Sequence, residues 1–87
     1  MARYSLEIRR SASREIADLP TKKDRRLVVD RIAKLADDSR PPGSEKLAGE
    51  DRYRVRQGAY RIVYEIQDAM LLVRIVKVGH RREVYRQ

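Results

Sequence analysis

The first part of the chain changes from a strand-like to a helix-like spacing of apolar residues. Residues 4–8 alternate apolar and polar side chains, which predicts a half-buried strand. Two segments with apolar residues every three or four positions follow, and they predict two amphipathic helices. Ser11 and Thr21 are expected to cap the two helices, and Pro20 ends the first, so the helices form a tight hairpin. The predicted buried stripes are Ala12, Ile16 and Leu19 in the first helix and Val28, Ile32, Leu35 and Ala36 in the second.

The second part of the chain has the spacing of strands. A loop with two prolines and a glycine at 39–44 separates it from the helices. Alternation at 53–56 and a largely apolar run at 60–66 predict two strands, and the nearly continuous apolar run at 71–78 predicts a central strand. The order β-α-α-β-β-β predicts a single α+β domain over residues 1–87, with a helical hairpin packed on an antiparallel-rich four-stranded sheet.

Gly58 and Ala59 fit a two-residue type II′ turn, with glycine at the first central position. In the register that follows from this turn, Arg56 lies directly opposite Arg61. Like charges in such positions cost about 0.2–1 kcal/mol, and folding alone offers no reason for them. A bound phosphate would turn the repulsion into a clamp, whereas without one the guanidiniums would extend into water. One face of the hairpin holds Tyr53, Val55, Ile62 and Tyr64 and is the expected core face, and the other holds Arg52, Arg54, Arg56 and Arg61.

The distribution of charge favours a polyanionic partner. The chain carries a net charge of +8. Residues 1–51 hold 12 basic and 10 acidic residues, a net of +2, whereas residues 52–87 hold 9 and 3, a net of +6. Eight of the nine basic residues in the second segment are arginine, which favours bidentate contacts with phosphate. The alternative, a charged surface that only keeps the protein in solution, does not require this asymmetry.

Several kinds of site and location are not indicated. The chain has no cysteine, and its helical acidic residues lack metal-ligand spacing, so neither a disulfide nor a metal or other cofactor is expected. No apolar segment suits a signal peptide or a membrane span, so we expect a cytoplasmic protein without a membrane partner. His80, the only histidine, is a candidate for proton transfer or a solvated side chain. Tyr85 is a candidate platform for an unstacked base or a packing residue.

Four segments resemble the RelE family of toxin–antitoxin systems. They are KLAG at 46–49, YRVR at 53–56, GAYRIVY at 58–64 and VKVGHRREVY at 76–85. The resemblance covers essentially the whole chain, with the helical hairpin matching in pattern and the strand-rich part in motif. It implies a toxin that a cognate, RelB-like antitoxin holds inactive, with operator DNA bound only through the complex with the antitoxin.

The resemblance also implies an activity. Members similar to RelE are metal-independent endoribonucleases that cleave mRNA in the ribosomal A site, by attack of the RNA 2′-OH on the adjacent phosphate. The family has lysines at 54 and 56, where this chain has arginines, and arginine cannot readily act as a general base. His80 and Tyr85 are then the candidates for proton transfer. The expected catalytic residues are Arg61, Arg81, Tyr85 and His80, and the expected substrate-binding residues are Lys46, Arg52, Arg54 and Arg56.

Two other functions stay open at this point. A ParE-like toxin uses the same fold to inhibit DNA gyrase and has no ribonuclease activity. A nucleic-acid-binding module without any activity is the third possibility. The chain ending GHRREVY favours the ribonuclease over both, because neither alternative needs the constellation of Arg61, Arg81 and Tyr85.

Overall fold

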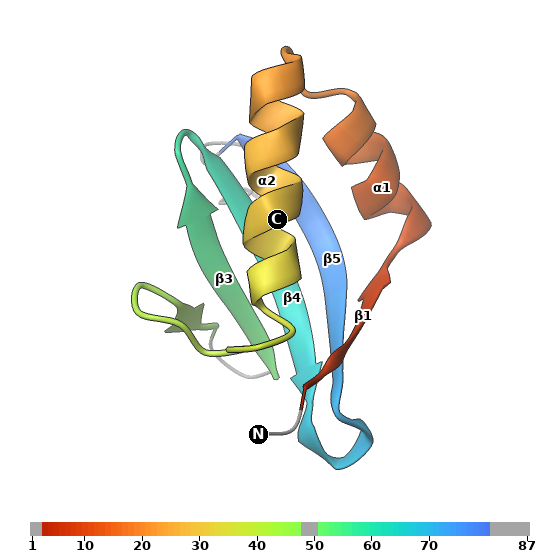
Figure 1. Cartoon of the computed structure of the whole chain (residues 1–87), viewed down its shortest axis with the longest axis vertical. Coiled ribbons are helices and arrows are strands. Elements are labelled where there is room, and N and C mark those ends of the chain that lie inside the picture. Colours follow the sequence, from red (N-terminus) through yellow and green to blue (C-terminus); the bar gives the residue numbers. More distant parts are fainter. Residues whose placement is uncertain (1–2, 48–50, 81–87) are drawn as a thin grey trace.

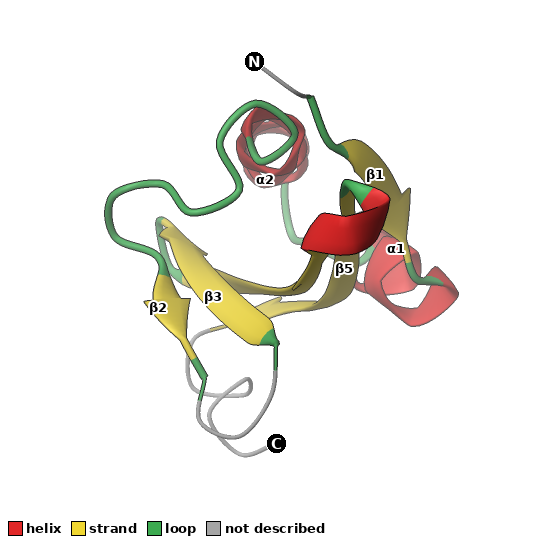
Figure 2. Cartoon of the chain, turned by 90° about the horizontal axis from the view of Figure 1, so that it is seen from below, coloured by secondary structure: helices red, strands yellow, loops and turns green. Residues whose placement is uncertain are grey.

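The computed structural model describes residues 3–47 and 51–80 (Figure 1). Helix α2 (Lys22–Lys34) lies across one face of a five-stranded sheet, and helix α1 (Arg10–Ala17) packs beside it along the last strand (Figures 1 and 2). The predicted α+β class and the order of the main elements are confirmed. The strands are β1 (Ser5–Ile8), β2 (Glu45–Lys46), β3 (Arg52–Gln57), β4 (Tyr60–Gln67) and β5 (Leu72–His80), and the short 3₁₀ helix η1 (Asp68–Met70) joins the last two.

The sheet is mixed, with the strand order β1-β5-β4-β3-β2. The first strand pairs in parallel with β5, and the remaining pairs are antiparallel. The run predicted to be a central strand does have neighbours on both sides, while β4 stands in the middle of the sheet. The sheet has one strand more than the sequence predicted, because the two-residue β2 pairs with the edge of β3.

A β-bulge in β5 explains why that strand shows no alternation in the sequence. Val63 pairs with Lys77 and Tyr64 with Ile75, so Val76 is the extra residue. A bulge shifts the side-chain alternation by one position, and Ile75 and Val78 can therefore both face the helices. The same shift decides which face each residue beyond the bulge occupies.

The core lies between the helices and the sheet. Both predicted helical stripes are buried, and Tyr64 from β4 is the largest fully buried side chain. Tyr53 and Tyr60 pack against this core from the same side, as the hairpin register predicted. Burial of this apolar surface is the main source of stability for the fold. The sheet contributes Val55, Ile62, Tyr64, Ile66, Val73, Ile75 and Val78, and the helical hairpin contributes Ala12, Ile16, Leu19, Val28, Ile32 and Leu35.

Two local expectations for the first part of the chain were wrong. Ser11 does not cap α1, because the helix begins at Arg10 and already includes Ser11, and its N-cap, Arg9, makes no side-chain capping bond. The β1 strand is less buried than its alternation suggested, since Leu6 and Ile8 are 38% and 42% exposed at the outer edge of the sheet. The Thr21 cap is confirmed: its hydroxyl accepts a 3.0 Å hydrogen bond from the backbone N–H of Asp24. In the described part of the chain, neither helix is long and apolar enough to cross a membrane.

Candidate functional site

The turn at Gly58 brings four arginines together on the sheet face that points away from the helices. Gly58 has φ +60°, as a type II′ turn requires at its first central residue. The predicted register is confirmed at every pair, and Arg56 lies directly opposite Arg61. Because Val55 and Ile62 face the core, the side chains on either side of them face the other way. We call this surface the arginine face; it comprises Arg52, Arg54 and Arg56 of β3 and Arg61 of β4.

The arginine face is not a row of fully solvated side chains. Arg61 is only 8% exposed, and the side chain of Arg54 is 20% exposed. Arg56, across from Arg61, is exposed. A guanidinium taken out of water needs hydrogen-bonded, charged surroundings to offset the loss of hydration. The expectation that these guanidiniums extend into water is therefore not met at Arg61. Arg61 is buried beside two other arginines, Arg54 and Arg56, on the same face.

One carboxylate lies beside Arg54, Arg56 and Arg61. Glu45 of β2 is paired with Arg54 of β3, and its Oε2 accepts a 2.6 Å hydrogen bond from Nη2 of Arg54. The neighbouring positive charges hold the pKa of the Glu45 carboxyl below its usual value of 4.5, first through Arg54 and then through Arg61 and Arg56. Its side chain is 60% exposed, so the carboxylate is charged and accessible at neutral pH.

The other described acidic groups on this side of the sheet are occupied elsewhere. Glu65 lies between Arg52 at 3.3 Å and Arg74 at 3.4 Å. Arg74 also pairs with Glu7 of β1 at 3.0 Å, so a chain of ion pairs crosses β3, β4, β5 and β1. This chain accounts for Arg52 as a structural partner of Glu65. At this end of the face the positive charges are therefore paired with carboxylates. We call the other end, with Arg54, Arg56, Arg61 and Glu45, the crowded end.

The structure does not bring all the predicted site residues to the arginine face. His80 pairs with Tyr60, and its ring meets the Tyr60 ring edge-on with centroids 6.2 Å apart, on the side that faces the helices. There it borders a cavity of about 430 Å³ together with α1. Lys46 pairs with Tyr53, so it lies on the opposite side of β2 from Glu45. Arg81 and Tyr85 lie outside the described residues.

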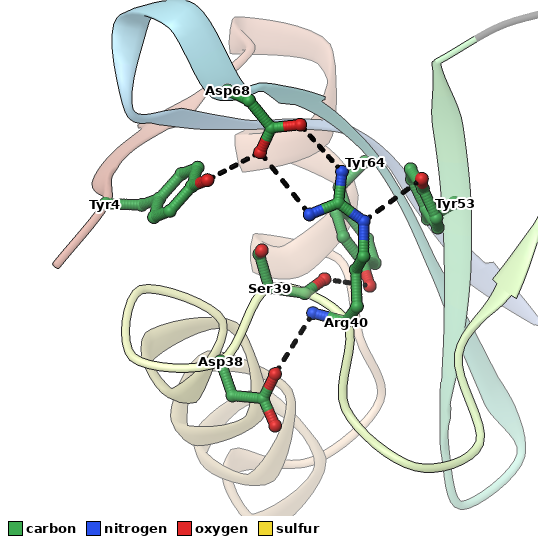
Figure 3. A network of polar contacts seen from close by, with 7 residues as sticks. All are labelled: Tyr4, Asp38, Ser39, Arg40, Tyr53, Tyr64 and Asp68. Atoms are coloured by element: carbon green, nitrogen blue, oxygen red, sulfur yellow. Dashed lines mark hydrogen bonds and ion pairs between the residues drawn. The ribbon is translucent and has the colours of Figure 1, made fainter. Parts of the chain in front are cut away.

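The loop that leads into β2 is held by a polar network (Figure 3). Arg40 donates to both oxygens of Asp68, at 3.3 and 2.9 Å, and its Nε donates to the Tyr53 hydroxyl at 3.2 Å. The Arg40 guanidinium lies 5.2 Å from the centroid of the Tyr53 ring, which adds a cation–π contact. Tyr4 donates to Asp68 from the other side, at 2.5 Å. The network ties the loop to the turn between β4 and β5, and thereby sets where Glu45 meets β3.

The titration of the network follows from these contacts. Hydrogen bonds from Arg40, and then from Tyr4, hold the pKa of the Asp68 carboxyl below its usual value. The same carboxylate raises the pKa of Tyr4. Burial raises the pKa of Tyr64 to about 12, and its hydroxyl donates a 2.8 Å hydrogen bond to the carbonyl of Ser39. At neutral pH the charged Asp68 carboxylate and the protonated Tyr64 hydroxyl therefore both hold the start of the loop in one conformation.

Sequence reasoning missed Glu45, and the reason is its short strand. A two-residue strand shows no periodicity, and the preceding prolines and glycine indicated only a loop. The described residues contain no cluster of three or more His, Cys, Asp or Glu side chains that could hold a metal ion. Among the described residues, the groups gathered around Arg54, Arg56 and Arg61 are their guanidiniums and the Glu45 carboxylate.

Comparisons with known proteins agree with this fold. The family model described as ParE toxin of type II toxin-antitoxin system, parDE, matches residues 6–85. The toxin–antitoxin complex RelBE2 of Mycobacterium tuberculosis contains a chain with 27% identity and a TM-score of 0.79, covering 91% of this chain and 99% of that one. The isolated Escherichia coli RelE toxin has 27% identity and a TM-score of 0.77, covering 95% and 92%. No curated protein sequence is significantly similar to the chain.

A more distant structure supports the fold alone. The archaeal RelE–RelB complex from Pyrococcus horikoshii OT3 contains a chain with 24% identity and a TM-score of 0.77, covering 93% of this chain and 97% of that one. The similarity spans the helical hairpin and the whole sheet, because nearly the full length of each chain is covered.

Proposed function

Since the chain belongs to the ParE toxin family of type II toxin–antitoxin systems, within the RelE/ParE superfamily, we propose that it is a metal-independent endoribonuclease that cleaves mRNA in the ribosomal A site. The observation that supports this proposal is the crowding of Arg54, Arg56 and Arg61 on one sheet face. Two of them stand directly opposite each other, which is unfavourable without an anion. A phosphate of the RNA backbone is the anion that such a set of guanidiniums binds best.

The reaction is internal transesterification. The RNA 2′ oxygen attacks the adjacent phosphorus, the bond from phosphorus to the 5′ oxygen breaks, and the products are a cyclic phosphate and a free 5′-OH. Arg56 and Arg61 bind the non-bridging oxygens and stabilise the charge that develops on them. Positioning of the 2′ oxygen in line with the leaving group supplies much of the remaining rate. By the resemblance, Arg81 and Tyr85 complete the site, as a further cation and as a base platform.

The positions of His80 and Lys46 limit their roles. His80 contacts Tyr60 on the helix side of the sheet, so we assign it no step of the proposed chemistry on the arginine face. Lys46 lies at the sheet edge, on the side of β2 away from Glu45, so we propose for it only a contact with RNA outside the arginine face. Arg52 has a structural partner in Glu65 and serves mainly to extend the positive surface.

A cognate antitoxin is the expected protein partner. The similar Mycobacterium tuberculosis chain was crystallised in a toxin–antitoxin complex, and the structure of an Escherichia coli RelE variant was solved in complex with a RelB peptide. We therefore propose that a RelB-like antitoxin binds this cytoplasmic toxin and blocks the arginine face. Expression of the chain alone should arrest growth, and co-expression of the neighbouring gene should restore it. Normal growth with abundant soluble toxin would count against the toxin activity.

Inhibition of DNA gyrase is the competing function, and the ParE name of the matching family model is the observation that favours it. Induction of the chain, followed by mapping of mRNA 5′ ends and a gyrase cleavage assay on the same cultures, separates the two. Translation-dependent breaks in mRNA with intact DNA support the ribonuclease. DNA breaks and an SOS response with intact transcripts would show a gyrase poison instead.

A further inference from the structure

Glu45 lies directly opposite Arg54 at the edge of the arginine face and forms a 2.6 Å ion pair with it. It is the described carboxylate that interacts with all three arginines of the crowded end, most strongly with Arg54 and then with Arg61 and Arg56. A two-residue strand and a loop anchored through Arg40 hold it there. The carboxylate therefore lies beside the place where the RNA phosphate would bind.

The proposed reaction needs a group that this arrangement can supply. Attack by the 2′-OH becomes efficient when a base removes its proton, and guanidiniums remain protonated at all ordinary pH values. His80 lies on the other side of the sheet. Within the described residues, the crowded end of the arginine face holds one group that can accept a proton, and this group is the Glu45 carboxylate.

We propose that Glu45 is the general base of the cleavage reaction, and this inference rests on the proposed ribonuclease function. Arg54 donates from Nη2 to one carboxylate oxygen and so fixes its orientation. The 2′-OH proton passes to the carboxylate as the bond from the 2′ oxygen to phosphorus forms. The bond from phosphorus to the 5′ oxygen breaks, and the departing oxygen takes a proton from water. Glu45 then releases its proton to solvent.

The positive surroundings of Glu45 are compatible with this role. The arginines that make the carboxylate a weaker base also stabilise the negative charge on the 2′ oxygen. They therefore lower the proton affinity of both the carboxylate and the 2′ oxygen, and the transfer between the two is not disfavoured. The alternative role for Glu45 is that of a competitor, which occupies the guanidiniums until RNA displaces it. The two roles predict opposite effects of removing the charge, because a competitor slows the reaction and a base accelerates it.

The test is single-turnover cleavage of ribosome-bound mRNA by Glu45→Gln and Glu45→Ala, with RNA binding measured in parallel. Loss of a general base lowers the rate typically about 10²–10⁴-fold, so we expect both variants to lose that much while binding changes little. Formate, a small carboxylate, should restore part of the activity of Glu45→Ala in a concentration-dependent manner, compared with chloride at the same ionic strength. Such rescue is not expected for a structural role.

The matched control is Glu7→Gln, which removes a carboxylate from another arginine ion pair on the same sheet, the 3.0 Å pair with Arg74. It should cleave like the wild type, and thermal melts should show all variants folded. A Glu45→Gln rate close to or above that of the wild type would overturn the proposal, and so would a loss that formate does not rescue or that follows RNA binding. If the wild type itself cleaves no mRNA, the proposed function fails, which is a separate and distinguishable result.

Discussion

Replacing Arg56 by Gln is expected to raise the stability of the fold and to lower cleavage at the same time. Arg56 is exposed and stands directly opposite Arg61, with Arg54 on the same face two residues away. Glu45 interacts more strongly with Arg54 and Arg61 than with Arg56, so it offsets this repulsion least at Arg56. Glutamine keeps much of the length of the side chain but removes the charge.

The two effects can be estimated separately. Relief of a like-charge cross-strand pair contributes about 0.2–1 kcal/mol, which for a domain of this size raises the melting temperature by about 1–8 °C. Loss of a charge-assisted hydrogen bond to phosphate costs about 1.5–3 kcal/mol, or a decrease in cleavage of about 10- to 150-fold. The variant should therefore be more stable and less active, which no simple unfolding effect can produce.

The assay is a thermal melt at low salt and at about 1 M NaCl, where screening shortens the reach of exposed charges to about 3 Å. The gain in melting temperature should shrink at the higher salt concentration. Arg74→Gln is the matched control: it removes ion pairs to Glu7 and Glu65, so its melting temperature should not rise and its cleavage should be unchanged. A lower melting temperature for Arg56→Gln at low salt would refute the repulsion argument, and unchanged cleavage would refute the phosphate contact.

Three further predictions concern the frame around the site. Tyr64→Phe leaves the carbonyl of Ser39 without its 2.8 Å hydrogen bond inside the core and should cost about 1–3 kcal/mol in urea unfolding. Thr21→Ala removes the N-cap of α2 and should cost about 0.5–2 kcal/mol, whereas Thr21→Ser should melt like the wild type. Asp68 has a depressed pKa in the folded state, so its contribution is present above the ordinary value of 3.8 and is lost as the pH falls through the folded pKa. Asp68→Asn should therefore show a flatter loss of stability with acid than the wild type, and identical acid curves would rule out the contact with Arg40.

The sequence by itself determined most of the fold around the arginine face. The turn at Gly58 places the two flanking strands in one register, and alternation then separates Tyr53 and Val55 from Arg54 and Arg56. Likewise, the apolar spacing of the helices predicted their buried faces. These features depend on residues close together in the chain, where sterics and hydrogen bonding leave few options.

Only the tertiary structure decided which other groups join the site. Glu45 reaches Arg54 because the loop before β2 is anchored by Arg40 to Asp68, 28 residues further along the chain. The two-residue strand β2 itself is too short to show a pattern in the sequence. Similarly, the bulge at Val76 shifts the alternation of β5 and thereby places His80 beside Tyr60, away from the arginines. A continuous apolar run does not show which of its residues face which side of the sheet. Contacts between distant segments depend on how the whole chain packs. The sequence therefore specified the cations of the arginine face, and packing placed Glu45 beside Arg54 and His80 on the other side of the sheet.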